Sequence, residues 1–343
     1  MTARAAETGA VLAAARAGDE SAFARLVEPH RRELHVHCYR MVASFEDAED
    51  LVQETFLRAW RSRHTFDRGD WFRAWLYRIA TNVCLDSLRR NARRAQSSQS
   101  IAEVPWLQPY PDRLLDEAEV APSEEQPDAV VVARETIELA YLAVIQLLPP
   151  RQRAVLVLRD VLEWSASETA SALEMSVAAA NSALQRARAT LAEQPAQRRL
   201  ESTPAATSAA EEALLRGFIE THERGDSAAA LALVREDIRV TMPPNPGCHE
   251  GIAAIASLMA RAFHDGGGMG EWRLVPTRAN RQPAAASYLR APGDTQFRAF
   301  KLDVLRVEGD RIAEITTFGS GLFGAFGLAP TLQALTNAGA PAL

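Results

Sequence analysis

The hydrophobic periodicity of this chain changes character near residue 200. Before that point apolar residues recur at helical spacing, with few glycines or prolines, in blocks at residues 10–95 and 130–194. Beyond it, short helical stretches give way to strand-like runs with Gly-Asp turns at 293–294 and 309–310. The 343 residues suffice for two or three domains at about 150 residues each. The pattern therefore predicts two all-α domains followed by a C-terminal α+β domain.

The C-terminal block, residues 209–330, reads as two helices, then a strand, a loop and a third helix, and then an antiparallel meander. The last 13 residues, 331–343, are expected to be a tail. The expected helices are about 209–224, 226–235 and 252–263, the loop is Pro-rich at 243–248, and the strands are 238–242, 271–279, 284–290, 296–307 and 311–318.

Two segments read as linkers. Residues 96–129 carry repeated prolines, eight acids and one arginine, and residues 195–208 are rich in small residues. The first linker also contains Trp106, Leu107, Pro109, Tyr110 and Pro111, which is too aromatic a run for a plain spacer. For its acidic charge, a solvated spacer and a role in mimicking a polyanion fit equally well.

Composition excludes several classes of protein. The chain has a formal net charge of −6, yet residues 61–95 hold nine arginines against three aspartates, so binding to nucleic acid remains open. The three cysteines are far apart and form no CxxC pair, which argues against a disulfide or zinc framework and fits a cytoplasmic location. We expect no metal and no cofactor, and neither a membrane span nor a signal peptide.

The stretch from Asp47 to Trp60 predicts an amphipathic helix. Apolar residues at helical spacing form a core stripe on one face of this helix. The opposite face exposes Leu57 among carboxylates and an amide. An apolar anchor with a polar rim is typical of a protein-docking face, although periodicity alone also fits a solvated acidic face.

The next helix, from Asp70 onward, interleaves aromatic residues with arginines. Rings can stack on unpaired bases while guanidinium groups hold phosphates, which suits a melted nucleic acid. An amphipathic helix with ordinary core tryptophans is the alternative.

Together these motifs, Asp-x-x-Asp-Leu-x-Gln-Glu-x-Phe-Leu-x-x-Trp and then Phe-x-x-Trp-Leu-x-x-Ile-Ala-x-Asn, resemble region 2 of the extracytoplasmic-function (ECF) branch of the sigma-70 family. The resemblance implies contacts with the β′ clamp helices of RNA polymerase by Asp47, Asp50, Leu51, Gln53, Glu54 and Leu57. It implies recognition of the minus-ten promoter element by Arg73, Trp75, Tyr77, Arg78, Asn82, Asp86, Arg89 and Arg90.

A helix-turn-helix pattern follows. Ser165 and Glu168 form a capping box for a short helix, Glu174–Ser176 is the turn, and Ser176 caps a second helix from Val177 to Ala192. An antiparallel helical hairpin is the alternative. The sequence resembles region 4 of the same family, which binds the β flap and reads the minus-35 element; the implied DNA contacts are Ser176, Val177, Ala180, Asn181, Ser182, Arg186 and Arg188.

The C-terminal block resembles the SnoaL-like group of the NTF2-like fold, a curved sheet and helices around a conical cavity. The whole chain looks most like the SigG-like subgroup of ECF factors. Asp303 is the best candidate for a catalytic carboxylate, but alternation along its strand leaves its direction open. The histidines His222, His249 and His264 show no metal spacing, and Asp265–Gly268 is read as a loop. We therefore expect no catalytic residue.

The predicted architecture is a region 2 helical bundle, a region 4 helix-turn-helix and an α+β NTF2-like cone. The predicted function is an alternative sigma factor that binds core RNA polymerase and promoter DNA. The fused domain would modulate activity by contacting the sigma domains or the Trp106–Pro111 segment. Two alternatives stay open: the cone is an enzyme or a ligand sensor with the sigma part as its output, or the chain binds DNA without polymerase.

Overall fold

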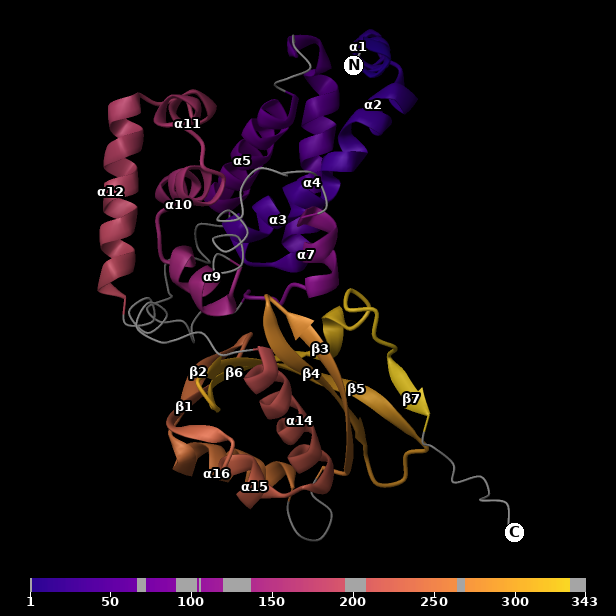
Figure 1. Ribbon diagram of the computed structural model, residues 1–343, viewed down its shortest axis with the longest axis vertical. Coiled ribbons are helices and arrows are strands. Elements are labelled where there is room, and N and C mark those ends of the chain that lie inside the picture. Colours follow the sequence, from indigo (N-terminus) through magenta and orange to yellow (C-terminus); the bar gives the residue numbers. More distant parts are fainter. Residues whose placement is uncertain are drawn as a thin grey trace. The chain divides into compact units, whose positions relative to one another are not determined.

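The computed structural model describes residues 2–66, 72–90, 104, 106–119, 137–194, 208–263 and 269–333. The chain divides into two compact units. The first holds residues 1–110 and 114–201, and the second holds Pro111–Arg113 with residues 202–343. Figure 1 shows helices throughout the first unit and a strongly curved sheet with helices in the second. Each unit is described by itself.

Among the described residues, six helices build the N-terminal part of the first unit. Asp19 and Ser44 begin α2 and α4 by accepting hydrogen bonds from main-chain amides of the first turn. Ala43, in the left-handed conformation, ends α3 and turns the chain into α4. The helices are α1 (Thr2–Ala17), α2 (Glu20–Val27), α3 (Arg31–Val42), α4 (Phe45–Arg61), α5 (Phe72–Arg90) and α7 (Asp112–Glu119), whose first two residues belong to the second unit.

Four helices lie in residues 137–194, the described part of the chain that follows the first linker. Pro150 begins α10 at a position where a missing amide hydrogen costs nothing. The predicted capping box of Ser165 and Glu168 is present at α11, and Ser176 caps α12. The helices are α9 (Leu139–Gln146), α10 (Pro150–Leu156), α11 (Ala166–Ala172) and α12 (Val177–Glu193), with a π-helical turn at Val157–Val161. The helix-turn-helix is thus α11, a short turn and α12.

Arg153 of α10 is the largest fully buried side chain of the first unit. Its guanidinium donates to the main-chain oxygens of Ile145, Gln146 and Leu148 and to that of Met41 at the end of α3. A buried guanidinium is tolerated because its N–H groups find acceptors. This side chain therefore joins the helix-turn-helix module to the N-terminal helices.

The second unit is a sheet with the order β2-β1-β6-β5-β4-β3. Helix α14 packs on strands β3 and β4, and helix α16 packs on β1 and β2. Between the helices and the sheet lies a core that includes Phe218, Ile238 and Leu305. The elements are α14 (Ser208–Arg224), α15 (Ser227–Leu231), β1 (Val234–Met242), β2 (Asn245–Glu250), α16 (Ile252–Ala262), β3 (Glu271–Ala279), β4 (Gln282–Arg290), β5 (Gln296–Glu308), β6 (Arg311–Gly319) and β7 (Thr331–Gln333).

The structure corrects four local predictions in this unit. The expected helix 226–235 ends at Leu231, because β1 begins at Val234. The expected loop 243–248 is largely β2, which pairs antiparallel with β1. Strand β1 pairs parallel with β6, so the sheet is mixed rather than a pure meander. Residues 331–333, expected in the tail, form β7 on the edge of β5.

Candidate functional site

The predicted docking face of α4 is exposed around one leucine. The Leu57 side chain is 51% exposed, and Asp50 and Gln53 are exposed beside it on successive turns. Asp47 and Glu54 are half-buried on the same face. An apolar side chain held in water by a stable helix, with polar groups around it, is the arrangement expected of a protein-docking surface.

Leu51, also predicted to contact polymerase, lies in the core of the first unit with 6% exposure. Its position on the helix places it beside Ala48 and Val52, on the packed side of α4. Leu51 therefore holds α4 in place and is not part of the exposed face.

Asp86, predicted to face the promoter, makes ion pairs within the unit. Arg58 of α4 donates to it at 2.6 Å, and Arg89 of α5 donates to its other oxygen at 2.6 Å. The hydrogen bonds from Arg58 to Asp86 and to Glu54 raise the pKa of the Arg58 guanidinium. Asp86 thus links α4 to α5.

The other residues predicted to contact the minus-ten element lie along α5 with different exposures. Arg73, Arg78, Arg89 and Arg90 are exposed, whereas Trp75 is half-buried against Phe66 and Phe72. Tyr77 is buried and donates its hydroxyl hydrogen to Glu33. Burial raises the pKa of the Tyr77 hydroxyl well above its usual value.

Asn82 and Arg78 lie where α5 meets the helix-turn-helix module. Asn82 donates to the main-chain oxygen of Ala172 at 3.5 Å, and Arg78 lies 3.9 Å from a carboxylate oxygen of Glu174. Tyr77 also meets the ring of Trp164 edge-on, with ring centroids 6.2 Å apart. The middle of α5 is therefore in contact with the helix-turn-helix module.

Helix α12 and its cap carry the residues predicted to contact the minus-35 element. Ser176, Val177, Asn181, Ser182 and Arg186 are exposed, whereas Ala180 is buried and packs the helix onto its module. Arg188 is 61% exposed and pairs with Asp160 at 2.7 Å, and the hydrogen bond with Asp160 raises the pKa of its guanidinium. So exposed an ion pair is weak in water, and Arg188 can exchange Asp160 for a phosphate at small cost.

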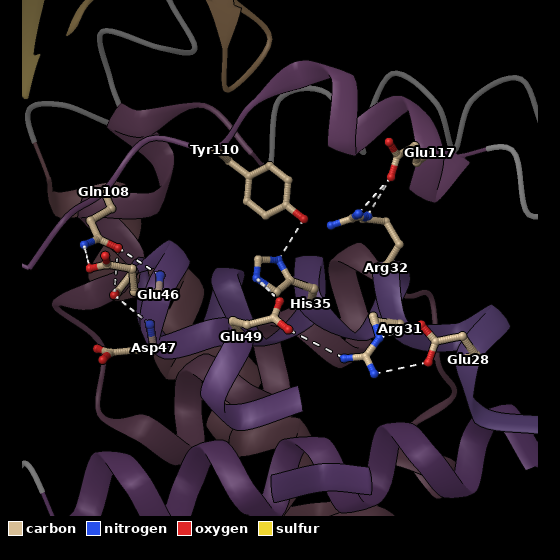
Figure 2. A network of polar contacts seen from close by, with 11 residues as sticks. Glu28, Arg31, Arg32, His35, Glu46, Asp47, Glu49, Gln108, Tyr110 and Glu117 are labelled. Atoms are coloured by element: carbon tan, nitrogen blue, oxygen red, sulfur yellow. Dashed lines mark hydrogen bonds and ion pairs between the residues drawn. The ribbon is translucent and has the colours of Figure 1, made fainter. Parts of the chain in front are cut away.

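The aromatic segment of the first linker is docked on the first unit (Figure 2). Gln108 lies at the beginning of α4, where its Oε1 accepts from the amide of Glu46 at 3.0 Å and from the hydroxyl of Ser44 at 3.1 Å. Its Nε2 donates to the Glu46 carboxylate at 2.7 Å, and Tyr39 donates to its main-chain oxygen at 2.6 Å. The linker thus completes the N-terminal cap of α4.

Tyr110 anchors the same segment from the other side. Its hydroxyl shares a 2.8 Å hydrogen bond with Nδ1 of buried His35, and Glu49 of α4 lies 3.6 Å from the other ring nitrogen (Figure 2). Burial, and then the nearby charge of Arg32, lower the pKa of His35 to about 4. His35 is therefore neutral at pH 7. Of the other linker residues, Leu107 and Pro109 are also buried and Trp106 is half-buried.

The next three linker residues belong to the second unit. Pro111 forms an isolated β-bridge with Ala279, and Asp112 accepts a hydrogen bond from the amide of Arg281 at 2.8 Å. Arg278 lies 3.4 Å from the same carboxylate. Consecutive residues of one short segment are therefore held by different units.

The second unit contains a cavity of about 380 Å³. Asp303, whose direction the sequence left open, lines this cavity together with Lys301, His222 and Trp272. The register of β5 with β4 shifts between Ala299 and Lys301, so the bulge precedes Asp303, and Lys301 and Asp303 share one face as alternation predicts. His249 lies in β2, while His264 and the Asp265–Gly268 motif fall outside the described residues.

No group of three or more His, Cys, Asp and Glu side chains among the described residues could hold a metal ion. No helix in that part of the chain is both long and apolar enough to cross a membrane.

Two important residues were missed from the sequence. Nothing in the sequence marked Arg153 as a buried residue, because an arginine in a helical pattern is normally exposed. Gln108 lies between Leu107 and Pro109 in the aromatic motif, and a polar residue enclosed by an apolar run was a usable signal for a buried cap.

Comparison with known proteins matches this layout. The Sigma-70 region 2 model matches residues 26–94, the Sigma-70 region 4 model matches 138–191, and the SnoaL-like domain model matches 215–315. The ECF RNA polymerase sigma factor SigG of Mycobacterium tuberculosis is 41% identical over 335 residues, covering 92% of this chain and 86% of that protein. The chain belongs to the ECF sigma factors.

Other relatives of this ECF sigma factor match different shares of the chain, from about half to nearly all of it. SigW of Bacillus subtilis is 30% identical and covers 52% of this chain and 90% of its own length. The crystal structure of SigJ from Mycobacterium tuberculosis covers 90% of this chain and 99% of its own, with a TM-score of 0.57 and 22% identity. The fold, two helical sigma regions followed by an NTF2-like domain, is therefore that of a solved sigma factor.

Proposed function

We propose that this sigma factor docks on the β′ clamp helices of core RNA polymerase through the exposed face of α4. The observation that carries the proposal is Leu57, which is half-exposed among Asp50, Gln53 and Glu54 on an otherwise well-packed helix. The α4 helix is capped by Gln108 and linked to α5 by Arg58 and Asp86, so the face is rigid before it binds. Preorganisation of this kind lowers the entropy cost of association.

The exposed arginines of α5, with Trp75 and Asn82, support reading of a melted minus-ten element. Guanidinium groups provide the salt-dependent affinity for phosphates, and rings stack on bases. On α12, Asn181 and Ser182 are exposed near the beginning of the helix, where a recognition helix meets base edges in the major groove. The module that carries α12 also supports the proposed contact with the β flap.

The packing of α5 against α11 supports a resting state for the compact first unit. Asn82 cannot both donate to the main-chain oxygen of Ala172 and contact a base. The two DNA-binding modules must also reach separate promoter elements. Their separation is therefore part of promoter binding in this proposal, and it requires breaking the contacts of Arg153 with Met41.

The C-terminal domain is proposed to modulate transcription without catalysis. Support comes from the linker, in which Gln108 and Tyr110 are held by the first unit and Asp112 by the second. A change in the second unit can therefore reach the N-terminus of α4 through at most a few residues of chain. Since its partner is core RNA polymerase, we place the protein in the cytoplasm.

Run-off transcription with core polymerase and a randomised promoter library tests the promoter contacts. The wild-type chain is expected to select two separate sequence boxes. Asn181→Ala with Ser182→Ala should relax the upstream box by about tenfold and leave the downstream box unchanged, because each base contact contributes about 1–3 kcal/mol. Asn82→Ala should relax selection of the downstream box and leave selection of the upstream box unchanged. Unchanged selection by both variants would refute the assigned contacts.

A further inference from the structure

Glu33 lies in the first turn of α3, and its carboxylate meets the beginning of α5. The side chain is 12% exposed, so its charge is largely shielded from water. Its Oε2 accepts from Nε of Arg73 at 2.7 Å and from the hydroxyl of Tyr77 at 3.2 Å, while Oε1 accepts from Nδ1 of His30. Three side chains thus engage one carboxylate, and two of them belong to α5.

The Glu33 carboxylate is ionised when it holds these groups. Burial alone would raise its pKa, but the hydrogen bond from His30 and the charge of Arg73 outweigh burial and lower the pKa. A carboxylate without its proton can only accept, so the three neighbouring side chains are the donors. Hydrogen bonds to a charged group are shorter and stronger than those between neutral groups. Glu33 therefore fixes the orientation of the side chains that donate to it.

The Arg73 guanidinium is held along one edge and open at its end. Its Nε donates to Glu33, and its Nη2, on the same edge, lies 3.5 Å from the Tyr77 hydroxyl. The central carbon of the guanidinium lies over the Tyr77 ring, 5.0 Å from the ring centroid. The Arg73 side chain is nevertheless 59% exposed, and its Nη1 makes no hydrogen bond to another described residue. The outer end of the guanidinium is therefore free to meet an anion from solution.

Holding Arg73 in this way has a consequence for binding. A long side chain that is ordered only when it binds loses rotamer freedom, which weakens binding by about two- to tenfold. The Arg73 side chain has lost part of that freedom before any anion arrives. The negative charge of Glu33 lies on the protein side of the guanidinium, so it holds the held edge and leaves the outer end for a phosphate.

We propose that Glu33 is a positioning residue for promoter binding, which holds Arg73 so that the free end of its guanidinium meets a phosphate of the melted minus-ten strand. The inference rests on the proposed contact between Arg73 and the minus-ten element, and it adds a residue from a different helix. Tyr77, which is 3% exposed, supports the guanidinium from below and does not stack on a base.

The test is binding of a forked promoter fragment by the full-length chain in complex with core RNA polymerase. The fragment carries a single-stranded minus-ten box selected by the wild-type chain, and affinity is measured between about 50 and 200 mM salt. Glu33→Gln keeps the shape of the side chain and removes its charge, so Arg73 becomes less ordered. We expect binding to weaken about three- to fivefold, with the salt dependence unchanged because the phosphate contact still forms.

Glu28→Gln is the matched control. Glu28 pairs with Arg31 at 2.7 Å, the same separation as that of Glu33 and Arg73, but the Glu28 side chain is exposed. The control variant therefore changes the net charge by the same amount and breaks an ion pair of the same length. Removing a negative charge favours DNA binding slightly, so Glu28→Gln should bind the fragment as tightly as the wild type or slightly more tightly.

Arg73→Ala separates positioning from a purely structural role. This variant should bind about tenfold more weakly and lower the salt slope by about 0.7, because one phosphate contact to a single strand is lost. In the Arg73→Ala background, Glu33→Gln should have no further effect. Thermal unfolding and the affinity for core polymerase establish that each variant is folded and docks normally.

Two results overturn the positioning role while the Arg73 contact stands. An equal loss from Glu33→Gln with and without Arg73 would show that Glu33 only stabilises the fold. Wild-type or tighter binding by Glu33→Gln would show that the carboxylate does not prepare Arg73 for DNA. Wild-type binding by Arg73→Ala is a different outcome, because it would refute the proposed minus-ten contact itself and the inference with it.

Discussion

Gln108 accepts a hydrogen bond from the main-chain amide of Glu46 at 3.0 Å, so that a linker residue caps the helix proposed to dock on polymerase. Gln108→Ala removes this acceptor but keeps the main-chain bonds of Gln108 with Ala43 and Tyr39. We expect the linker to stay docked and the first turn of α4 to lose about 1–2 kcal/mol. Hydrogen exchange at Glu46 should speed up about tenfold, whereas Gln296→Ala, on an exposed strand edge, should leave it unchanged.

Leu57 and Ile252 form a matched pair of exposed aliphatic residues, 51% and 38% exposed, in different units. Leu57→Asp should weaken binding to core RNA polymerase by about 30-fold or more, since a central apolar anchor contributes at least about 2 kcal/mol. Ile252→Asp should bind like the wild type. Fluorescence anisotropy with labelled sigma factor measures both, and equal affinities would remove the α4 face from the interface.

Arg153 and Arg151 both lie in α10, one buried and one exposed. Arg153→Met should destabilise the first unit by about 3–5 kcal/mol, because several carbonyl oxygens lose their donors together. Arg151→Ala should change stability by less than about 0.5 kcal/mol. Urea unfolding followed by hydrogen exchange at α10 amides separates the two. A small loss of stability in Arg153→Met would contradict this prediction, because it would show that water can replace the guanidinium.

His37 makes the stability of the first unit depend on pH. The hydroxyl of Thr81 donates to the main-chain oxygen of Tyr77, so His37 Nε2, 2.9 Å from that hydroxyl, is the donor and Nδ1 carries the lone pair. Burial, and then the charge of Arg40, lower the pKa of His37 to about 3. The unfolded chain therefore takes up a proton first as the pH falls below about 6.5.

The stabilising effect of neutral His37 is thus complete above about pH 6.5 and is lost as the pH falls towards 3. Between pH 7 and pH 5 the wild type should lose on the order of 2 kcal/mol through this residue. His37→Met should remove that part of the loss, and His249→Gln in the second unit should not. Urea titrations at both pH values, read by hydrogen exchange in α3 and α5, measure it; an unchanged slope in His37→Met would refute the assignment.

Local chemistry could be predicted from the sequence wherever one residue determines the outcome. Ser165 with Glu168 and Ser176 each specify a cap, and both caps are present. Leu57 stands out because an apolar residue interrupts a polar face. The parallel pairing of β1 with β6 could not be read, since neighbours in a sheet depend on the folding of the whole domain.

The site was harder to predict where a residue serves two purposes. Leu51 fits both the docking motif and the core stripe, and burial decides for the core. Asp86 matches a promoter-reading motif, but it also has two arginine partners in the folded chain. Alternation places Asp303 and Lys301 on one face of β5, but only the folded domain determines that this face lines the cavity.

The most direct test is run-off transcription with core RNA polymerase, comparing the full-length chain with a chain ending at Glu201. We predict promoter-specific initiation by both proteins at the same start sites and at different levels, with the sign of the difference giving the effect of the C-terminal domain. Absence of specific initiation by both, with core polymerase active alongside another sigma factor, would contradict the account.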